Sequence, residues 1–255
     1  QLQLPQLYFA QVAEGNPNEG LDFTKAHHLV LGYEYALNRS TVLSVEGYYQ
    51  SLFNVPIIDS PESSFSALNL LEGFVSERLV NEGTGRNYGV EIALQKYLTD
   101  DLYFLGNASL YESKYTGGDG IERNTRFNGN YIVNLTGGKE WKWAKENRRM
   151  IFGLNSRLAL LGGFRDTPID VNASKETRQT IFIESEAFTL QQQDYFKIDL
   201  RLYYKRNKPN RTVTWALDVQ NLTNQENVAF NYFDTQKGEV VTKFQLGLIP
   251  ILTYR

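Results

Sequence analysis

The chain has 255 residues, a net charge of −3 and a mean hydropathy of −0.40. No run approaches the roughly 18 consecutive apolar residues of a membrane-spanning helix, so a helical membrane protein is excluded. The charge gives no indication of nucleic-acid binding, and the absence of cysteine excludes disulfides and thiolate zinc sites. Membrane-spanning strands are not excluded, because such strands alternate apolar with polar residues and have a mildly polar average hydropathy.

Strands follow one another along the whole chain, because apolar and polar residues alternate with a period of two. Between Tyr195 and Tyr204 this alternation separates two faces completely, as a strand does and a helix does not. In chain order we predict ten strands, at residues 2–10, 26–37, 41–53, 85–98, 102–115, 125–137, 149–162, 194–205, 212–222 and 242–255. Most are longer than the about five to six residues of soluble strands and reach the about nine to eleven of a tilted membrane strand.

The connections alternate strictly between long and short. Long ones are expected at 11–25, 54–84, 116–124, 163–193 and 223–241, and short ones at 38–40, 99–101, 138–148 and 206–211. Outer-membrane barrels have short periplasmic turns and longer extracellular loops. The pattern therefore predicts an all-β, antiparallel transmembrane β-barrel segment of about ten long strands in the cell outer membrane. No helix of any length is expected.

Two segments near the C-terminus carry a family resemblance. A strand with internal Asp, Asp194–Tyr204, precedes a short turn and the strand Trp215–Asn224, which ends on Asn-Leu-Thr-Asn. This order resembles TonB-dependent outer-membrane receptors, where the second strand closes on an Asn-Leu-Phe-Asp-like motif before one last loop and strand. Gly85–Glu91 also resembles a strand opening of that family.

The resemblance implies a 22-stranded barrel, of which residues 1–255 would form the C-terminal part. A few C-terminal residues, the plug domain, the TonB box and the N-terminal strands are expected outside this chain. An open half-sheet would leave backbone groups unpaired in lipid, so it needs further strands.

The function implied by the resemblance is TonB-energised uptake of a scarce nutrient, such as an iron-siderophore, cobalamin, a glycan or a peptide. The implied partners are outer-membrane lipid, the receptor's own plug, and TonB with its inner-membrane motor acting through the N-terminal region. A surface lipoprotein is a further candidate partner. Neither a cofactor nor a nucleic acid is expected.

Two alternatives remain open from the residues alone. One is a passive outer-membrane channel or small ten-strand barrel, and the other is a soluble β-sandwich that serves in binding or adhesion. An enzyme is not expected, since His27 and His28 are the only histidines and no protease or lipase motif accompanies them. These two adjacent strand residues face opposite ways, so they cannot hold one metal together.

Candidate site residues fall into two groups. Aromatic and basic residues in the long loops are the candidates for substrate binding, because loops usually carry specificity: Phe164, Arg165, Phe182, Phe188, Phe230, Tyr232 and Phe233. Polar residues on the inward face are expected to line the lumen and contact the plug: Glu34, Glu46, Glu91, Gln95, Asn128, Asn130, Arg157, Lys197, Asp199, Arg201 and Asp218.

Overall fold

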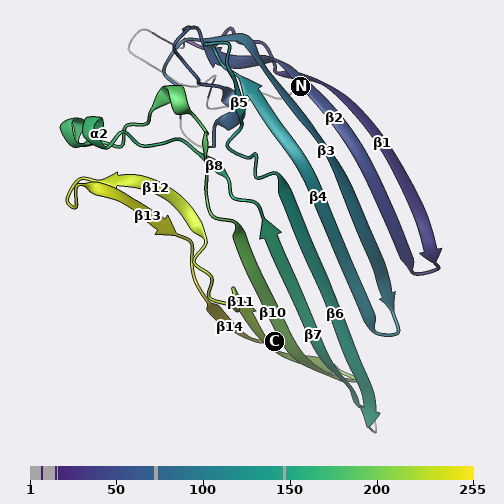
Figure 1. The fold of residues 1–255 in the computed structure, drawn as a ribbon. Helices are drawn as coiled ribbons and strands as arrows, with labels where there is room; N and C mark the ends of the chain where they lie inside the picture. Colours follow the sequence, from purple (N-terminus) through teal and green to yellow (C-terminus); the bar gives the residue numbers. More distant parts are fainter. Residues whose placement is uncertain (1–6, 8–14, 16, 72–73, 146–147) are drawn as a thin grey trace.

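One antiparallel sheet dominates the structure, a computed structural model that describes residues 7, 15, 17–71, 74–145 and 148–255. The sheet has ten strands, in the order β1-β2-β3-β4-β6-β7-β10-β11-β14 with the short β5 beside β4 (Figure 1). The all-β fold of about ten antiparallel strands is therefore confirmed. Of the predicted strand 2–10, the structure describes only Leu7, which is helical and buried and so does not support a strand there.

The sheet contains a counterpart of every predicted strand from 26–37 onwards. Its strands are β1 (Lys25–Asn38), β2 (Thr41–Ile58), β3 (Leu79–Thr99), β4 (Leu102–Thr116), β5 (Glu122–Asn124), β6 (Tyr131–Lys145), β7 (Arg148–Leu161), β10 (Tyr195–Lys208), β11 (Arg211–Gln220) and β14 (Ile249–Tyr254). Each neighbouring pair is antiparallel, so consecutive connections lie at opposite ends of the sheet.

Tight turns close one end of the sheet. At the first, the Ser40 amide donates a hydrogen bond to Asn38 Oδ1 over 2.9 Å. At the second, Asp100 and Asp101 both have positive φ, 53° and 61°, which the two-residue hairpin turn with matching twist requires. The long connections gather toward the other end (Figure 1). The predicted alternation of short and long connections is thus present in the fold.

The long connections contain small elements that the sequence pattern did not indicate. β8 (Arg165–Asp166) pairs with β9 (Leu190–Gln191), and β12 (Val228–Asp234) forms a hairpin with β13 (Glu239–Phe244). Among the described residues, the connections also contain the 3₁₀ turns η1 (Ala67–Asn69) and η2 (Glu184–Glu186) and the helix α2 (Val171–Thr177). The expectation of no helix was wrong here: Asp170 caps α2 by accepting bonds from the Asn172 and Ala173 amides.

Several predicted boundaries differ from the structure. β2 runs to Ile58 and not to residue 53, and β3 begins at Leu79 and not at residue 85, so the long connection between them is shorter than predicted. The predicted strand 242–255 is two strands, because β13 belongs to the outlying hairpin and β14 to the main sheet. The predicted strand 125–137 begins only at Tyr131, since residues 125–130 form a turn. The predicted turn 138–148 is shorter than expected, because β6 continues to Lys145 and β7 begins at Arg148.

The sheet has one apolar and one polar face. The pairing register places the apolar residues of each strand on the same side of the sheet, which we call the apolar face. It includes Leu29, Leu31, Val45, Tyr49, Val90, Ile92, Leu135, Leu158, Leu202, Leu217 and Leu252. Several of these side chains are open to the surroundings, with exposures of 74% at Leu29, 81% at Leu31 and 84% at Leu252. A water-facing surface does not carry such a continuous apolar patch. The opposite side is called the polar face below.

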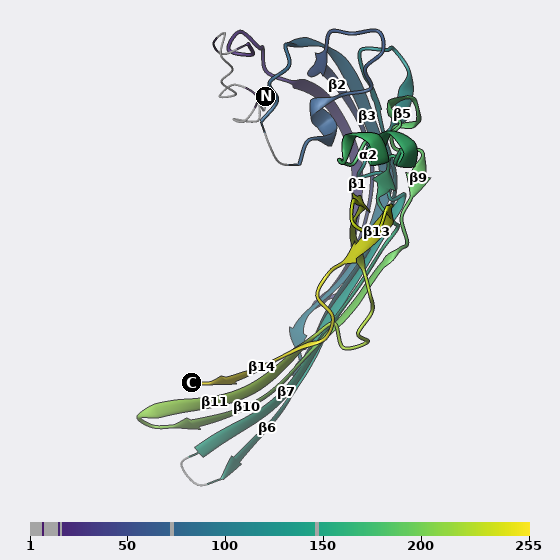
Figure 2. The ribbon, with the colours of Figure 1, turned by 90° about the vertical axis from the view of Figure 1, so that its left-hand side faces the viewer.

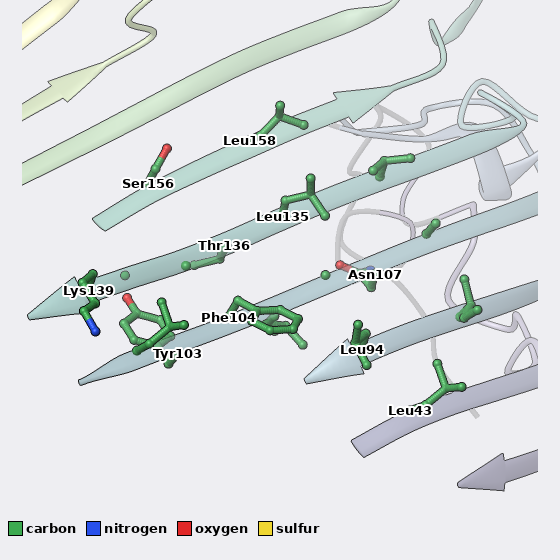
Figure 3. Close-up of a pocket in the computed structure, with 18 of the residues that line it drawn as sticks. Leu43, Leu94, Tyr103, Phe104, Asn107, Leu135, Thr136, Lys139, Ser156 and Leu158 are labelled. Carbon is green, nitrogen blue, oxygen red and sulfur yellow. The ribbon is translucent and has the colours of Figure 1, made fainter. Parts of the chain in front are cut away.

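A groove of about 820 Å³ lies in the apolar face (Figure 3). Its floor holds the small residues Gly106, Gly137 and Ser156, and larger side chains from β2, β3, β4, β6 and β7 surround them. A Cβ atom at Gly106 would lie 2.9 Å from Leu135 Cδ2, so that leucine already leans over the glycine.

The sheet is strongly curved and open. Turned by 90°, the lower ends of β6, β7, β10, β11 and β14 bend together away from the line of the upper part of the sheet (Figure 2). Among the described residues, the outer strands β1 and β14 each pair on one side only. The sheet is therefore a curved segment and not a closed barrel by itself.

Candidate ligand pocket

A pocket of about 530 Å³ lies on the polar face, at the end where the long connections gather. The main sheet supplies its floor, and the connections after β2, β5 and β7 supply its rim. The lining residues are Tyr48, Gln50, Leu52, Leu68, Asn87, Tyr111, Ser113, Thr125, Phe127, Ile132, Leu161 and Phe164. The volume is in the range of small-molecule sites, and the lining mixes aromatic with neutral polar groups, as such sites usually do.

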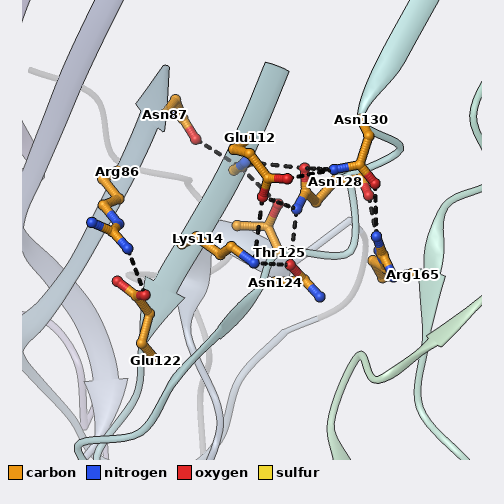
Figure 4. Close-up of polar contacts among 11 residues, drawn as sticks. Arg86, Asn87, Glu112, Lys114, Glu122, Asn124, Thr125, Asn128, Asn130 and Arg165 are labelled. Atoms are coloured by element: carbon orange, nitrogen blue, oxygen red, sulfur yellow. Dashed lines mark hydrogen bonds and ion pairs between the residues drawn. The ribbon is translucent and has the colours of Figure 1, made fainter. Parts of the chain in front are cut away.

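A hydrogen-bond chain of four neutral side chains crosses the pocket. Thr125 Oγ1 lies 2.8 Å from Ser113 Oγ, and Ser113 Oγ donates to Asn87 Oδ1 over 2.6 Å. Asn87 Nδ2 then donates to Gln50 Oε1 over 2.8 Å. These side chains come from the turn before β6 and from β4, β3 and β2, and Asn87 and Thr125 are visible in Figure 4. The bonds fix the orientation of both amides.

Aromatic rings stand around this chain. The Tyr111 hydroxyl donates to the Phe127 carbonyl over 2.8 Å and accepts the Gly129 amide over 3.2 Å, so its ring is held at both sides of the turn. Phe127 and Phe164 meet edge to face with centroids 6.0 Å apart. On β1, His28 meets the Tyr48 ring edge to face at 6.2 Å. The aromatic side chains of the pocket wall are thus held in place by hydrogen bonds and ring contacts with neighbouring residues.

A second polar network holds the turn 125–130 that covers the pocket (Figure 4). Asn128 is fully buried; its Nδ2 donates to Glu112 and Asn124, and its Oδ1 accepts the Ser113 amide. Asn130 Nδ2 donates to Glu112 Oε1 over 2.8 Å. Arg165 closes the network, because its Nε donates to the Asn128 carbonyl and its Nη2 to Asn130 Oδ1.

Arg126 ties this turn to the connection between β2 and β3. Its amide donates to Asn69 Oδ1 over 2.9 Å and its guanidinium to the Asn69 carbonyl over 3.2 Å. Burial lowers the pKa of the Arg126 guanidinium, while the negative charge of Asp166 acts in the opposite direction. The turn is therefore anchored from both sides before any ligand is considered.

Comparison with known proteins identifies the architecture. A family model described as TonB dependent receptor-like, beta-barrel matches residues 3–222. The chain belongs to this family of TonB-dependent receptors. The crystal structure of the ferric-catecholate import receptor Fiu from E. coli K12 is similar in fold, with a TM-score of 0.58 and 14% sequence identity. That match covers 99% of this chain and 30% of the Fiu chain. A search of curated proteins finds no match.

Within this TonB-dependent receptor segment, only one of the loop candidates for substrate binding lines the pocket, namely Phe164. Arg165 is engaged by the turn beside it. Phe188 packs edge to face on Tyr115, with centroids 5.9 Å apart, and Phe233 is buried with its amide bonded to Thr180 Oγ1. The others lie apart on the loop surface: Phe182 and Phe230 are exposed, and Tyr232 contacts Phe230 and Lys243.

Most residues expected to face the lumen share the polar face. The register places there Glu34, Glu46, Glu91, Gln95, Arg157, Lys197, Asp199, Arg201 and Asp218. Arg201 Nη1 donates to both carboxylate oxygens of Asp218, over 2.8 and 2.9 Å, and Lys197 Nζ lies 3.3 Å from Asp199 Oδ1. Asn128 and Asn130 instead precede β6 and hold the turn described above.

The sequence reasoning did not select the pocket residues of β2, β3 and β4. A usable signal existed, because Tyr48 with Gln50 and Tyr111 with Ser113 alternate on one face near the loop ends of their strands. The two histidines do face opposite ways: His27 stacks on Phe53 at 4.9 Å, while His28 contacts Tyr48. Across residues 17–71, 74–145 and 148–255, no three His, Cys, Asp or Glu side chains group as metal ligands. In the same part of the chain, no helix is long and apolar enough to span a membrane.

Proposed function

We propose that the chain forms part of the wall and the extracellular loops of an outer-membrane receptor that imports a scarce nutrient with energy from TonB. The observation that carries the proposal is the pocket: it opens on the polar face, beside the long connections, in a sheet of this receptor family. A ligand arriving from outside would meet this pocket before it reached the remainder of the lumen.

The apolar face is the lipid-facing surface in this proposal. Its exposed leucines match the outward apolar band of membrane barrels. Near the tight turns, aromatic rings contact one another across neighbouring strands, with centroids 5.6 Å apart for Trp141 and Phe152 and 5.8 Å for Tyr204 and Trp215. Aromatic girdles mark membrane interfaces. The tight turns would then be periplasmic and the long connections extracellular.

The polar face is the wall of the lumen in this proposal, where the plug domain would pack. Glu46 lies directly opposite Glu91 in the register of β2 and β3, and like charges in that position repel each other. Cationic or hydrogen-bonding groups of a plug would offset that repulsion. TonB and its inner-membrane motor would act through the plug, and a surface lipoprotein is a further candidate partner at the loops.

The substrate would be one of the nutrients expected above: an iron-siderophore, cobalamin, a glycan or a peptide. Fiu is described as a ferric-catecholate receptor, which favours an iron chelate by analogy alone. A soluble β-sandwich is less favoured, since its apolar faces would meet in a core while here Leu29, Leu31 and Leu252 are exposed. Members of the family are transporters, and no enzymatic role is proposed.

The experiment uses the full-length receptor in its own host, with and without TonB. Cell envelopes are separated on a sucrose gradient, and uptake is measured with labelled ferric siderophores, cobalamin, oligosaccharides and peptides. We expect the receptor in the outer-membrane fraction and uptake of one probe class that stops when TonB is removed. Equal uptake without TonB would leave a passive channel, and a receptor found in the soluble fraction would remove the membrane assignment.

A further inference from the structure

The charges in and around the pocket on the polar face limit the ligands that it can take. Every side chain that lines it is uncharged. The nearest charged groups that the register places on the same face are carboxylates: Glu46 is two residues before Tyr48 on β2, and Glu91 faces Ser109 on β4, where Ser109 Oγ lies 3.4 Å from Glu91 Oε1. Two arginines stand beside the lining residues, but both are engaged by the turn 125–130: Arg126 binds Asn69, and Arg165 binds Asn128 and Asn130. The lining itself therefore offers no charged group to an anion.

The hydrogen-bond chain leaves a donor at one end and an acceptor at the other. Each internal group is used by its neighbour, from Thr125 through Ser113 and Asn87 to Gln50. Gln50 Nε2 makes no hydrogen bond within the described part of the chain, so both of its hydrogens can reach a ligand. At the far end, Thr125 Oγ1 still has lone pairs to accept a bond. Ligand hydroxyls, which donate and accept together, suit both ends.

The aromatic rings supply apolar surfaces beside these polar ends. Tyr48, Tyr111, Phe127 and Phe164 line the same pocket as the four chain members. The face of an aromatic ring is electron-rich and attracts the weakly positive C–H groups of an apolar ligand surface. Because Tyr111 is bonded at both sides of the turn, its ring is ordered before binding and loses little freedom.

From this geometry we infer that the pocket binds an uncharged, hydroxyl-rich ligand, that is, a neutral saccharide, with Gln50 and Thr125 bonding its hydroxyls and the four rings covering its C–H face. The inference rests on the proposed function and narrows it to one substrate class. It departs from the fold analogy with a ferric-catecholate receptor, because tricatecholate complexes of iron(III) are anionic. A peptide with charged termini is also disfavoured, because no lining residue carries a charge that could pair with its carboxylate or its ammonium group.

The test measures equilibrium binding to purified full-length receptor in detergent. The probes are maltohexaose, xylohexaose and chitohexaose, compared with an iron(III) tricatecholate complex and an uncapped hexapeptide. We expect at least one hexasaccharide to bind and both charged probes to fail. Binding of the iron complex or the peptide in place of every hexasaccharide would overturn the inference.

Two neighbouring tyrosines provide matched variants. Tyr48 lines the pocket, whereas Tyr49 lies on the apolar face beside Tyr88, with ring centroids 6.5 Å apart. Tyr48→Ala should weaken hexasaccharide binding roughly ten-fold, as expected for a lost ring contact worth about 1.4 kcal/mol, and Tyr49→Ala should leave it unchanged. Gln50→Leu keeps the side-chain volume but removes the donor, and it should weaken binding by a similar factor. Equal affinities for all three variants and the parent receptor would place the saccharide elsewhere.

Two controls distinguish a loss of binding from a loss of folding, and the inference about the pocket from the proposed transport function. Gel mobility of each unheated variant reports whether the barrel is folded, and Gln50→Leu carries the test where Tyr48→Ala proves unstable. If the saccharide binds but its uptake persists without TonB, the proposed function fails and the inference about the pocket stands. If TonB-dependent uptake is found only for an anionic iron chelate, the proposed function stands and the saccharide inference fails.

Discussion

Gly153 on β7 allows one tyrosine to reach across two strands. Tyr203 on β10 lies directly opposite Gly153, and its hydroxyl donates to Glu140 Oε1 on β6 over 2.5 Å. Glu140 is in turn the register partner of Gly153 on its other side. A Cβ atom at Gly153 would lie 2.1 Å from Tyr203 Cζ, so the ring occupies the space that any side chain there would need. Gly153→Val must therefore displace the ring and break its bond to Glu140.

The cost follows from two contributions. A hydrogen bond to a charged acceptor contributes about 1.5–3 kcal/mol, at the lower end where water reaches the acceptor. Overpacking adds about 1–3 kcal/mol, which the better strand propensity of valine offsets by up to about 1 kcal/mol. We expect Gly153→Val to lower the free energy of unfolding by roughly 2–4 kcal/mol.

Urea unfolding of the full-length receptor in lipid vesicles measures this change. Gly47→Val is the matched control, because a Cβ atom at Gly47 on the apolar face meets nothing within 4 Å. Tyr203→Ala removes the obstructing ring, so adding Gly153→Val to it should cost much less than Gly153→Val alone. If Gly153→Val unfolds at the same urea concentration as Gly47→Val, the reasoning about the Tyr203 ring is refuted.

Three further predictions test the faces, the turn and the outlying hairpin. Leu31→Arg should cost about 2–4 kcal/mol in vesicles, while Gly32→Arg, on the polar face beside Glu46, should cost far less; similar urea midpoints would contradict the lipid assignment. Arg165→Lys cannot make both bonds to the turn and should lower local stability by about 1–2 kcal/mol, seen as faster amide exchange at residues 128–130; unchanged exchange would refute the anchor. The Lys237 and Gln236 amides hold the pKa of Asp234 below its usual 3.8, so its contribution to hairpin stability persists at neutral pH and is lost only as the pH falls through that lowered value; an NMR titration midpoint at or above 3.8 would contradict this.

The sequence was sufficient to predict the strands because alternation is a local property. Each strand from 26–37 onwards could be found from its own residues, without knowing its partner. Long-range contacts decided what was missed. β14 is separated from β13 by residues 245–248, where Leu248 donates to Asn224 Oδ1 and a Cβ atom at Gly247 would lie 2.5 Å from the same oxygen. No pattern within residues 242–255 predicts this contact with Asn224.

The turn 125–130 shows the same limit at the site. Arg126, Asn128 and Asn130 alternate with other residues as a strand would, yet Asn130 has a φ of 71° and Asn128 is buried among side chains distant in sequence. This turn folds over the sheet and supplies Thr125 and Phe127 to the pocket. The pocket was therefore missed although the facing of its β2, β3 and β4 residues could be read from alternation alone.

The pocket and the membrane-facing surface depend on the same register. Gln50, Asn87 and Ser113 come from three successive strands, and their bonds form only because Gln50 pairs with Asn87 and Asn87 with Ser113. A slip of one residue in any of these strands would turn its polar side chains toward lipid and its leucines toward the lumen. Any other register of these strands would therefore expose polar side chains to lipid, and only the observed register both avoids that cost and builds the pocket. Substitutions on the apolar face that weaken this penalty should impair ligand binding without touching the ligand, whereas a pocket substitution such as Gln50→Leu should weaken binding and leave the fold intact.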